Sequence, residues 1–119
     1  MPYKKCVASN SSLRRLRHSL NLVGLWDRFA PNIFSSEQVP NPKPAPDIYL
    51  FAAKQMETHP SACWVIEDSV LGVRAAKAAN MRVFGFTGGS HCGLNHGDRL
   101  LKEGAEKVFK QMDQIAESL

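Results

Sequence analysis

The sequence predicts an α/β fold in which helices cover a doubly wound, Rossmann-like parallel sheet. Short apolar segments with strand-forming composition alternate with segments whose apolar residues recur at helical spacing. Serine, asparagine, glycine and proline separate these segments, where helices usually begin and end. No internal repeat or linker divides the 119 residues, so we expect a single domain spanning residues 1–119.

Five segments have the composition of strands. Each is short and apolar, and the segment before Glu67 is a continuous apolar run, which is typical of a strand buried on both faces. The expected strands cover residues 3–8, 32–34, 63–66, 82–86 and 107–109.

Helical patterns connect these strands. The first helix follows a capping cluster at residues 9–12 and ends at Gly24. A second begins at Pro46-Asp47, because proline fits the first turn and an acid suits the positive end of the helix dipole. The remaining helices are expected at residues 69–79 with Asn80 as a left-handed cap, from a cap at Asp98 onward, and at residues 111–119.

Composition argues against several classes of protein. The hydrophobic fraction of 44% and the charged fraction of 22% are ordinary for a globular chain. No run of about 18 apolar residues occurs, and the apolar stretch near the start is too short for a secretory signal, so we expect a cytoplasmic protein. Cys6, Cys63 and Cys92 have unrelated spacings, which argues against a disulfide framework.

A serine stands where the first expected strand meets the first helix. Backbone N–H groups and the helix dipole form a phosphate seat at such a junction, and ligands of doubly wound sheets gather at the carboxyl ends of the strands. Ser9 and Asn10 are therefore candidate phosphate-binding residues. The alternative is that Ser9 is an ordinary helix N-cap.

Two adjacent carboxylates, Glu67 and Asp68, end the apolar run at residues 63–66. Burying such a pair is unfavourable unless a cation accompanies it. Because magnesium takes one or two protein carboxylates and keeps waters and substrate phosphate, the pair is a candidate Mg²⁺ site. The alternative is that Asp68 and Ser69 merely cap the next helix.

Lys43 lies in a proline-rich loop at residues 39–46. Prolines on both sides restrict the backbone and fix the direction of the lysine side chain. A rigidly held ammonium suits a phosphate oxygen, so Lys43 is a further candidate for a phosphate site. A solvated surface lysine is the alternative interpretation.

The order of these motifs strongly resembles the haloacid dehalogenase-like superfamily, in its β-phosphoglucomutase-like phosphatase branch. Ser9 matches the second motif of that family, Lys-Pro-x-Pro-Asp beginning at Lys43 the third, and Glu-Asp-Ser-x-x-Gly-x-x-Ala-Ala beginning at Glu67 the fourth. Lys43 precedes Asp68 by 25 positions, within the range of the family, and the resemblance covers nearly the whole chain.

The resemblance implies a Mg²⁺-dependent hydrolase of small phosphorylated metabolites. Asp68 would then bind the metal ion, with Glu67 binding it directly or through water. Ser9 and Lys43 would be catalytic residues that hold the phosphoryl group, with help from the Asn10 backbone. The paired acids also favour phosphate chemistry over true dehalogenation, because dehalogenases of this superfamily have uncharged residues at this strand end.

The family's first motif is not found in the sequence. That motif, similar to Asp-x-Asp-Gly-Thr, carries the nucleophile and the general acid/base, whereas this chain has aspartates at 27, 47, 68, 98 and 113 and no Asp-x-Asp. The helical cap domain between the first two motifs is missing as well. By the resemblance, the chain is the C-terminal part of the family's core and lacks the central strand between those ending at Ser9 and Glu67.

Removing a central strand leaves two unpaired edges, which is a folding liability. We therefore expect that the sheet re-pairs, that a missing N-terminal segment or a second chain supplies the strand, or that the sequence is a truncated product. We also expect no appreciable phosphatase turnover and weak Mg²⁺ affinity from the isolated chain. The rival interpretation is a non-catalytic, degenerate α/β protein or interaction module.

Other charged and metal-binding side chains suggest no further partner. The basic cluster Arg14, Arg15, Arg17 and His18 has no interleaved aromatic residues, so we interpret it as a solvated helix face and expect no nucleic acid or membrane partner. The spacing of His91, Cys92 and His96 fits no structural zinc site.

Overall fold

The strands form two separate parallel sheets in the computed structural model, which describes residues 4–88 and 95–110. In the first sheet, β1 (Val7–Ser9) pairs with β2 (Ile33–Ser35). The second sheet has the order β3 (Trp64–Glu67), β4 (Arg82–Phe86) and β5 (Val108–Phe109). The α/β class with parallel pairing is confirmed.

Helices connect the strands in the expected alternation. They are α1 (Leu13–Leu22), α2 (Trp26–Phe29), α3 (Asp47–Gln55), α4 (Val70–Ala78) and α5 (His96–Glu103), with 3₁₀ turns η1 (Ser36–Gln38) and η2 (Pro60–Ala62). Two predicted helix ends are confirmed by backbone geometry, since Gly24 follows α1 with φ of 73° and Asn80 follows α4 with φ of 61°. Within residues 4–88 and 95–110, no helix is long and apolar enough to cross a bilayer.

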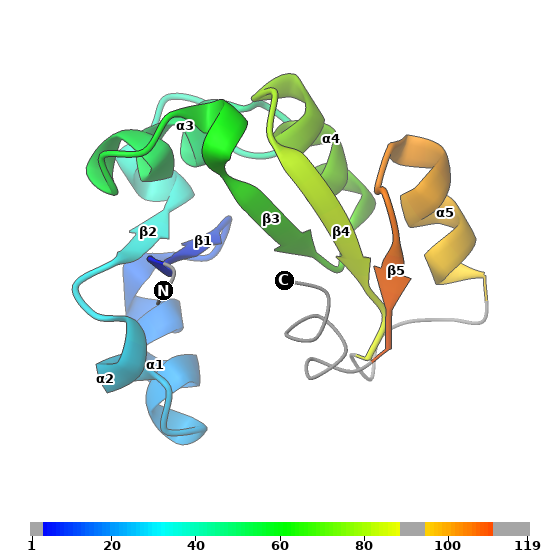
Figure 1. Ribbon diagram of the computed structural model, residues 1–119. Coiled ribbons are helices and arrows are strands. Elements are labelled where there is room, and N and C mark those ends of the chain that lie inside the picture. Colours follow the sequence, from blue (N-terminus) through cyan, green and yellow to red (C-terminus); the bar gives the residue numbers. More distant parts are fainter. Residues whose placement is uncertain (1–3, 89–94, 111–119) are drawn as a thin grey trace.

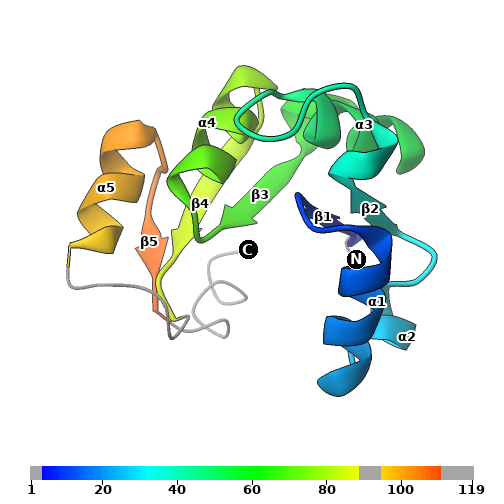
Figure 2. The ribbon, with the colours of Figure 1, turned by 180° about the vertical axis from the view of Figure 1, so that it is seen from behind.

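The helices place the two sheets on opposite sides of the molecule (Figure 1). Seen from behind, α1 and α2 accompany the first sheet, whereas α4 and α5 accompany the second (Figure 2). The main core belongs to the second sheet, where Val73 of α4, Val83 of β4 and Leu100 of α5 are all fully buried.

Helix α3 bridges the two sheets (Figure 1). Its Ile48 is fully buried in the core of the second sheet. Its Phe51 ring meets the ring of Phe34 in β2 edge-on, with centroids 5.6 Å apart. The two sheets are therefore joined through one helix although their strands do not pair.

Several local expectations were wrong. We expected a strand buried on both faces before Glu67, but burial alternates along β3. Trp64 and Ile66 are 43% and 41% exposed, whereas Val65 and Glu67 are buried. The first strand begins at Val7. Helix α5 begins at His96 without a side-chain cap, so Asp98 lies in its first turn. The expected helix at residues 111–119, and the pair at 91 and 92, lie outside the described residues.

The edges of β1 and β3 remain unpaired with each other. The strand order keeps the two sheets distinct within the described part of the chain. The first of the three alternatives, a sheet that re-pairs across the missing strand, is therefore contradicted.

Candidate functional site

Lys43 connects the carboxyl ends of β1 and β3. Its Nζ donates to the carbonyl oxygen of Ala8 at 3.2 Å and to Oε2 of Glu67 at 2.9 Å. The side chains of this ion pair are 8% and 9% exposed. The backbone N–H of Lys43 donates to Oδ1 of Asn10 at 3.0 Å. The alternative of a solvated surface lysine is therefore wrong.

Both carboxylate oxygens of Glu67 are bound by protein donors. Oε2 accepts from Lys43 and, at 2.6 Å, from the hydroxyl of Tyr49. Oε1 accepts from the backbone N–H groups of Asp68 and Ser69, each at 3.1 Å, and from the Ser69 hydroxyl at 3.0 Å. Burial alone would raise the pKa of Glu67, but the Lys43 ammonium and these hydrogen bonds outweigh it and hold the pKa below its usual value.

Gly72 allows this carboxylate to lie against the first turn of α4. A Cβ at Gly72 would lie 1.9 Å from Cδ and 2.2 Å from Oε2 of Glu67, far inside van der Waals contact. The glycine of the Glu-Asp-Ser-x-x-Gly segment is thus required by the place of the glutamate that precedes it.

Tyr49 is a site residue that the sequence analysis missed. Its side chain is buried, and the Lys43 ammonium lies 4.9 Å from the centre of its ring. Burial, and then the negative charge of Glu67, raise the pKa of Tyr49, so the hydroxyl stays protonated and donates. A signal existed in the sequence: a tyrosine in the first turn of a helix, on its buried side, needs a partner for its hydroxyl.

Ser9 ends β1, one residue after the Ala8 carbonyl that accepts from Lys43. Its Oγ accepts from the backbone N–H of Ser11 at 3.1 Å, whereas the N-cap of α1 is Ser12, whose side chain accepts from Arg15. The alternative of Ser9 as the helix cap is therefore wrong. A hydroxyl that accepts in this way keeps its own hydrogen to donate.

Asn10 holds the two loops together. Its side-chain oxygen accepts from Lys43, and its backbone carbonyl oxygen accepts from the hydroxyl of Ser36 at 2.8 Å. The Asn10 side chain therefore orients the Lys43 loop, and the role of its backbone toward phosphate stays a prediction.

Asp68 follows Glu67 at the end of β3 and is half-buried. The N-cap of α4 is Ser69, whose Oγ accepts from Gly72 at 3.0 Å, so the capping alternative applies to Ser69 and not to Asp68. The carbonyl oxygen of Asp68 accepts a hydrogen bond from Nε2 of His96 at the start of α5. The loop after β3 is thus fastened to two helices.

The carboxylates of Glu67 and Asp68 provide only part of a magnesium site. Across residues 4–88 and 95–110, no group of three or more His, Cys, Asp or Glu side chains is placed to hold a metal ion. Glu67 directs both oxygens at protein donors, so its geometry favours a role toward Lys43 over a direct metal bond. Of this acidic pair, Asp68 would then supply the hard oxygen ligand.

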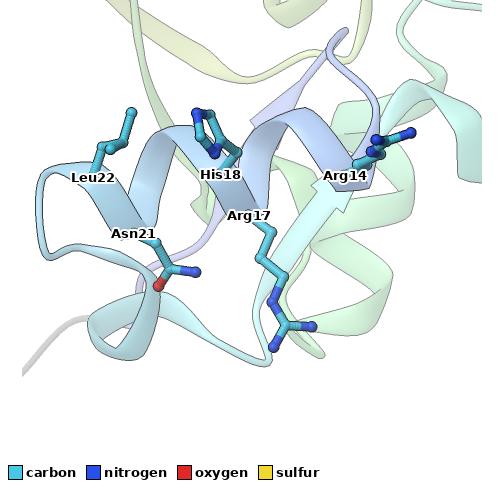
Figure 3. A pocket seen from close by; sticks show the side chains of 5 residues that line it. All are labelled: Arg14, Arg17, His18, Asn21 and Leu22. Atoms are coloured by element: carbon cyan, nitrogen blue, oxygen red, sulfur yellow. The ribbon is translucent and has the colours of Figure 1, made fainter.

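The basic face of α1 lies apart from this site. A shallow pocket there is lined by Arg14, Arg17, His18, Asn21 and Leu22, all from α1 (Figure 3). Arg17 lies over the Trp26 ring of α2, 5.4 Å from its centre, and the remaining basic side chains are exposed. This agrees with a solvated helix face.

Known proteins provide an independent comparison. Residues 2–80 match the family model of haloacid dehalogenase-like hydrolases. A phosphorylated carbohydrates phosphatase of Thermotoga maritima is 35% identical over 108 residues, which are 90% of this chain and 48% of that protein.

Solved structures give the same result. A haloacid dehalogenase-like protein of unknown function from Agrobacterium tumefaciens superposes with a TM-score of 0.95 and 43% identity, over 99% of this chain and 54% of that one. A HAD family hydrolase from Deinococcus radiodurans, solved with bound phosphate and sodium, superposes with a TM-score of 0.89 and 32% identity. The match covers 95% of this chain and 50% of that one. This chain spans no more than about half the length of the proteins it matches.

Proposed function

Because the chain belongs to the haloacid dehalogenase-like hydrolases, we propose that it provides the phosphate-holding part of a Mg²⁺-dependent phosphoric monoester hydrolase. The observation that carries this proposal is the buried Lys43 ammonium, held between the ends of β1 and β3 by the Ala8 carbonyl and the Glu67 carboxylate. A cation fixed there by protein groups is preorganised for the negative charge of a phosphoryl group.

Four residues of this chain act on the phosphoryl group, directly or through a neighbour. Ser9 donates its hydroxyl hydrogen to a phosphoryl oxygen, and Lys43 neutralises the charge of the phosphoryl group. Asn10 holds the Lys43 loop in place through the bond to its backbone N–H. Asp68 would hold Mg²⁺, which when bound would supply further neutralisation of the phosphoryl charge.

Small phosphorylated metabolites are the proposed substrates. The Thermotoga relative is described as a phosphatase of phosphorylated carbohydrates, and the Deinococcus structure contains phosphate. The excess of positive charge, +4 over the whole chain, also favours an anionic substrate.

The attacking carboxylate must be supplied by a strand between β1 and β3. Superposition over 99% of the chain supports this, since both sheets keep the relative placement they have in an Agrobacterium protein nearly twice as long. The Ala8 carbonyl also points away from β2, because the neighbouring Val7 N–H bonds to Asn32 and successive residues alternate in direction. We propose that a strand carrying Asp-x-Asp pairs with both edges, from an N-terminal segment or a second chain.

Complementation tests this function. The part of the Agrobacterium relative outside the matched 54% would be produced as a separate chain and mixed with this protein, and hydrolysis of p-nitrophenyl phosphate would be measured with Mg²⁺. We expect hydrolysis from the mixture and none from either chain alone. Lys43→Ala should abolish it, whereas the exposed Lys54→Ala should leave it unchanged.

Two results would contradict the proposal. One is hydrolysis by the isolated chain that survives Asp68→Ala. The other is a stable mixed complex that carries an intact Asp-x-Asp strand and still hydrolyses nothing, which would favour the non-catalytic interpretation.

A further inference from the structure

Three elements converge on one carboxylate oxygen of Glu67. Lys43 reaches Oε2 from the proline-rich loop at 2.9 Å, and Tyr49 reaches the same atom from α3 at 2.6 Å. On the other side, the carboxylate lies against the first turn of α4 at Gly72, where a Cβ would clash. The carboxylate is therefore held between α4 and α3, with Oε1 bound by Asp68 and Ser69 and Oε2 bound by Lys43 and Tyr49.

The orientation of the Lys43 ammonium depends on this carboxylate. An ammonium has three hydrogens to donate. Among the described residues, two are accounted for by the Ala8 carbonyl and Glu67 Oε2, which leaves one for a ligand at the ends of β1 and β3. The Tyr49 ring also lies beneath the ammonium, 4.9 Å from its centre. Tyr49 thus contacts both the cation and the anion that orients it.

We propose that Tyr49 is a positioning residue for Lys43, acting through Glu67 to direct the third hydrogen of the ammonium at an anion. The proposed function supplies the nature of that anion, a phosphoryl group. The positioning itself concerns the residues of this chain alone. The face of the Tyr49 ring contacts the ammonium, and the Tyr49 hydroxyl donates to the Glu67 oxygen with which the ammonium is paired.

A purely structural role would need the ring and not the hydroxyl. Phenylalanine at position 49 would keep the packing in the core and the contact between ring and ammonium. It would remove the donor at 2.6 Å from Oε2, which keeps Lys43, while Oε1 keeps its donors from Asp68 and Ser69. Comparing Tyr49→Phe with the wild type therefore separates positioning from packing.

The test is nuclear magnetic resonance of the lysine ammonium groups in the ¹⁵N-lysine-labelled 119-residue protein. Lys43 should give a slowly exchanging ammonium signal, because both its side chain and its partner are buried. Losing a hydrogen bond to a charged group should speed the exchange of that signal by about tenfold or more in Tyr49→Phe. The control is Thr58→Val, which removes a hydroxyl bond to the Met56 carbonyl after the same helix.

Inorganic phosphate then provides a second readout. It should shift the Lys43 signal of the wild type, and Tyr49→Phe should weaken that binding while Thr58→Val does not. If phosphate binds neither protein but Tyr49→Phe still speeds ammonium exchange, the proposed function is contradicted and the positioning role stands. If exchange in folded Tyr49→Phe matches the wild type within about twofold, the positioning role is overturned.

A second measurement covers the case in which Tyr49→Phe does not fold. Replacing tyrosine by 3-fluorotyrosine keeps the hydroxyl, and the ¹⁹F signal of Tyr49 reports on its surroundings. If Tyr49 and Lys43 share the carboxylate oxygen, Lys43→Met should shift this signal and the exposed Lys54→Met should not. Equal responses to the two variants would overturn the proposal.

Discussion

The two sheets of this protein differ in how they are stabilised. The second sheet has three strands, and its helices bury Val73, Val83 and Leu100 completely. The first sheet has two strands, and α1 beside it leaves Leu22 and Val23 73% and 67% exposed. Because an isolated two-stranded sheet is marginally stable, the first sheet depends on what ties it to the second.

Their ion pairs differ in the same way. Arg74 pairs with Glu103, and Arg82 with Glu106, on the surface of the second sheet and its helices. The buried pair of Lys43 and Glu67 instead connects the two sheets. The same residues, Lys43 and Glu67, therefore form the candidate phosphate site and hold the two sheets together.

Breaking the buried ion pair of Lys43 and Glu67 should lower the stability of the fold more than any other change. Glu67→Gln leaves the Lys43 ammonium buried without its anion, which should lower the free energy of unfolding by about 3–5 kcal/mol. Urea unfolding measures the loss. Hydrogen exchange should show faster opening of β1 and β2 than of β3 and β4. A change below about 1 kcal/mol would mean that the pair does not hold the sheets together.

Protonation of Glu67 should reproduce part of that loss. Its folded pKa is lowered, so the unfolded chain binds more protons and the pair contributes stability that is complete above the unfolded value of about 4.3. This contribution is lost as the pH falls through the folded pKa. Urea unfolding between pH 7 and pH 3 should therefore show a steeper decline in the wild type than in Glu67→Gln. Parallel curves would contradict the prediction.

A methyl group at Gly72 should have a smaller effect. Gly72→Ala forces Cβ into the Glu67 side chain, and displacing that buried carboxylate should destabilise the fold by roughly 1–3 kcal/mol. Gly97→Ala in α5 is the control, because its Cβ would meet Val108 at an ordinary 3.4 Å. Thermal unfolding compares the two, and equal midpoints would show that Glu67 moves aside freely.

The smallest effect should come from the exposed pairs of the second sheet. Arg74→Met should shift the unfolding midpoint least, since the Arg74 side chain is half exposed and ion pairs near the surface contribute only about 0–1 kcal/mol. Raising the salt concentration should likewise leave Arg74→Met and the wild type indistinguishable. A midpoint shift as large as that of Gly72→Ala would remove the contrast between buried and exposed pairs.

Much of this arrangement could be predicted from the sequence. Alternating patterns and capping residues located the strands and helices, and the order of the motifs placed Ser9 and Glu67 at the ends of two strands that Lys43 connects. The roles of these residues toward phosphate and magnesium stay predictions.

Other features depend on contacts that no local pattern encodes. The partnership of Tyr49 with Glu67 spans 18 positions and arises only when α3 packs on both sheets. The exposed face of Trp64 and Ile66 was mistaken for a buried one, because an apolar run does not say whether anything covers it. The cap of α1, Ser12, lies within the expected cluster at residues 9–12, whereas the expected cap at Asp98 was wrong because α5 begins at His96 without a side-chain cap.

Amide hydrogen exchange on strand addition tests the central claim most directly. The chain would be mixed with a separate segment that carries an Asp-x-Asp strand, taken from the part of the Agrobacterium relative outside the matched 54%. We predict new protection at Ala8 of β1 and along β3, the two edges beside the proposed strand, and none along β2 and β5, the outer edges of the two sheets. Protection at β2 or β5 without β1 and β3 would contradict the account.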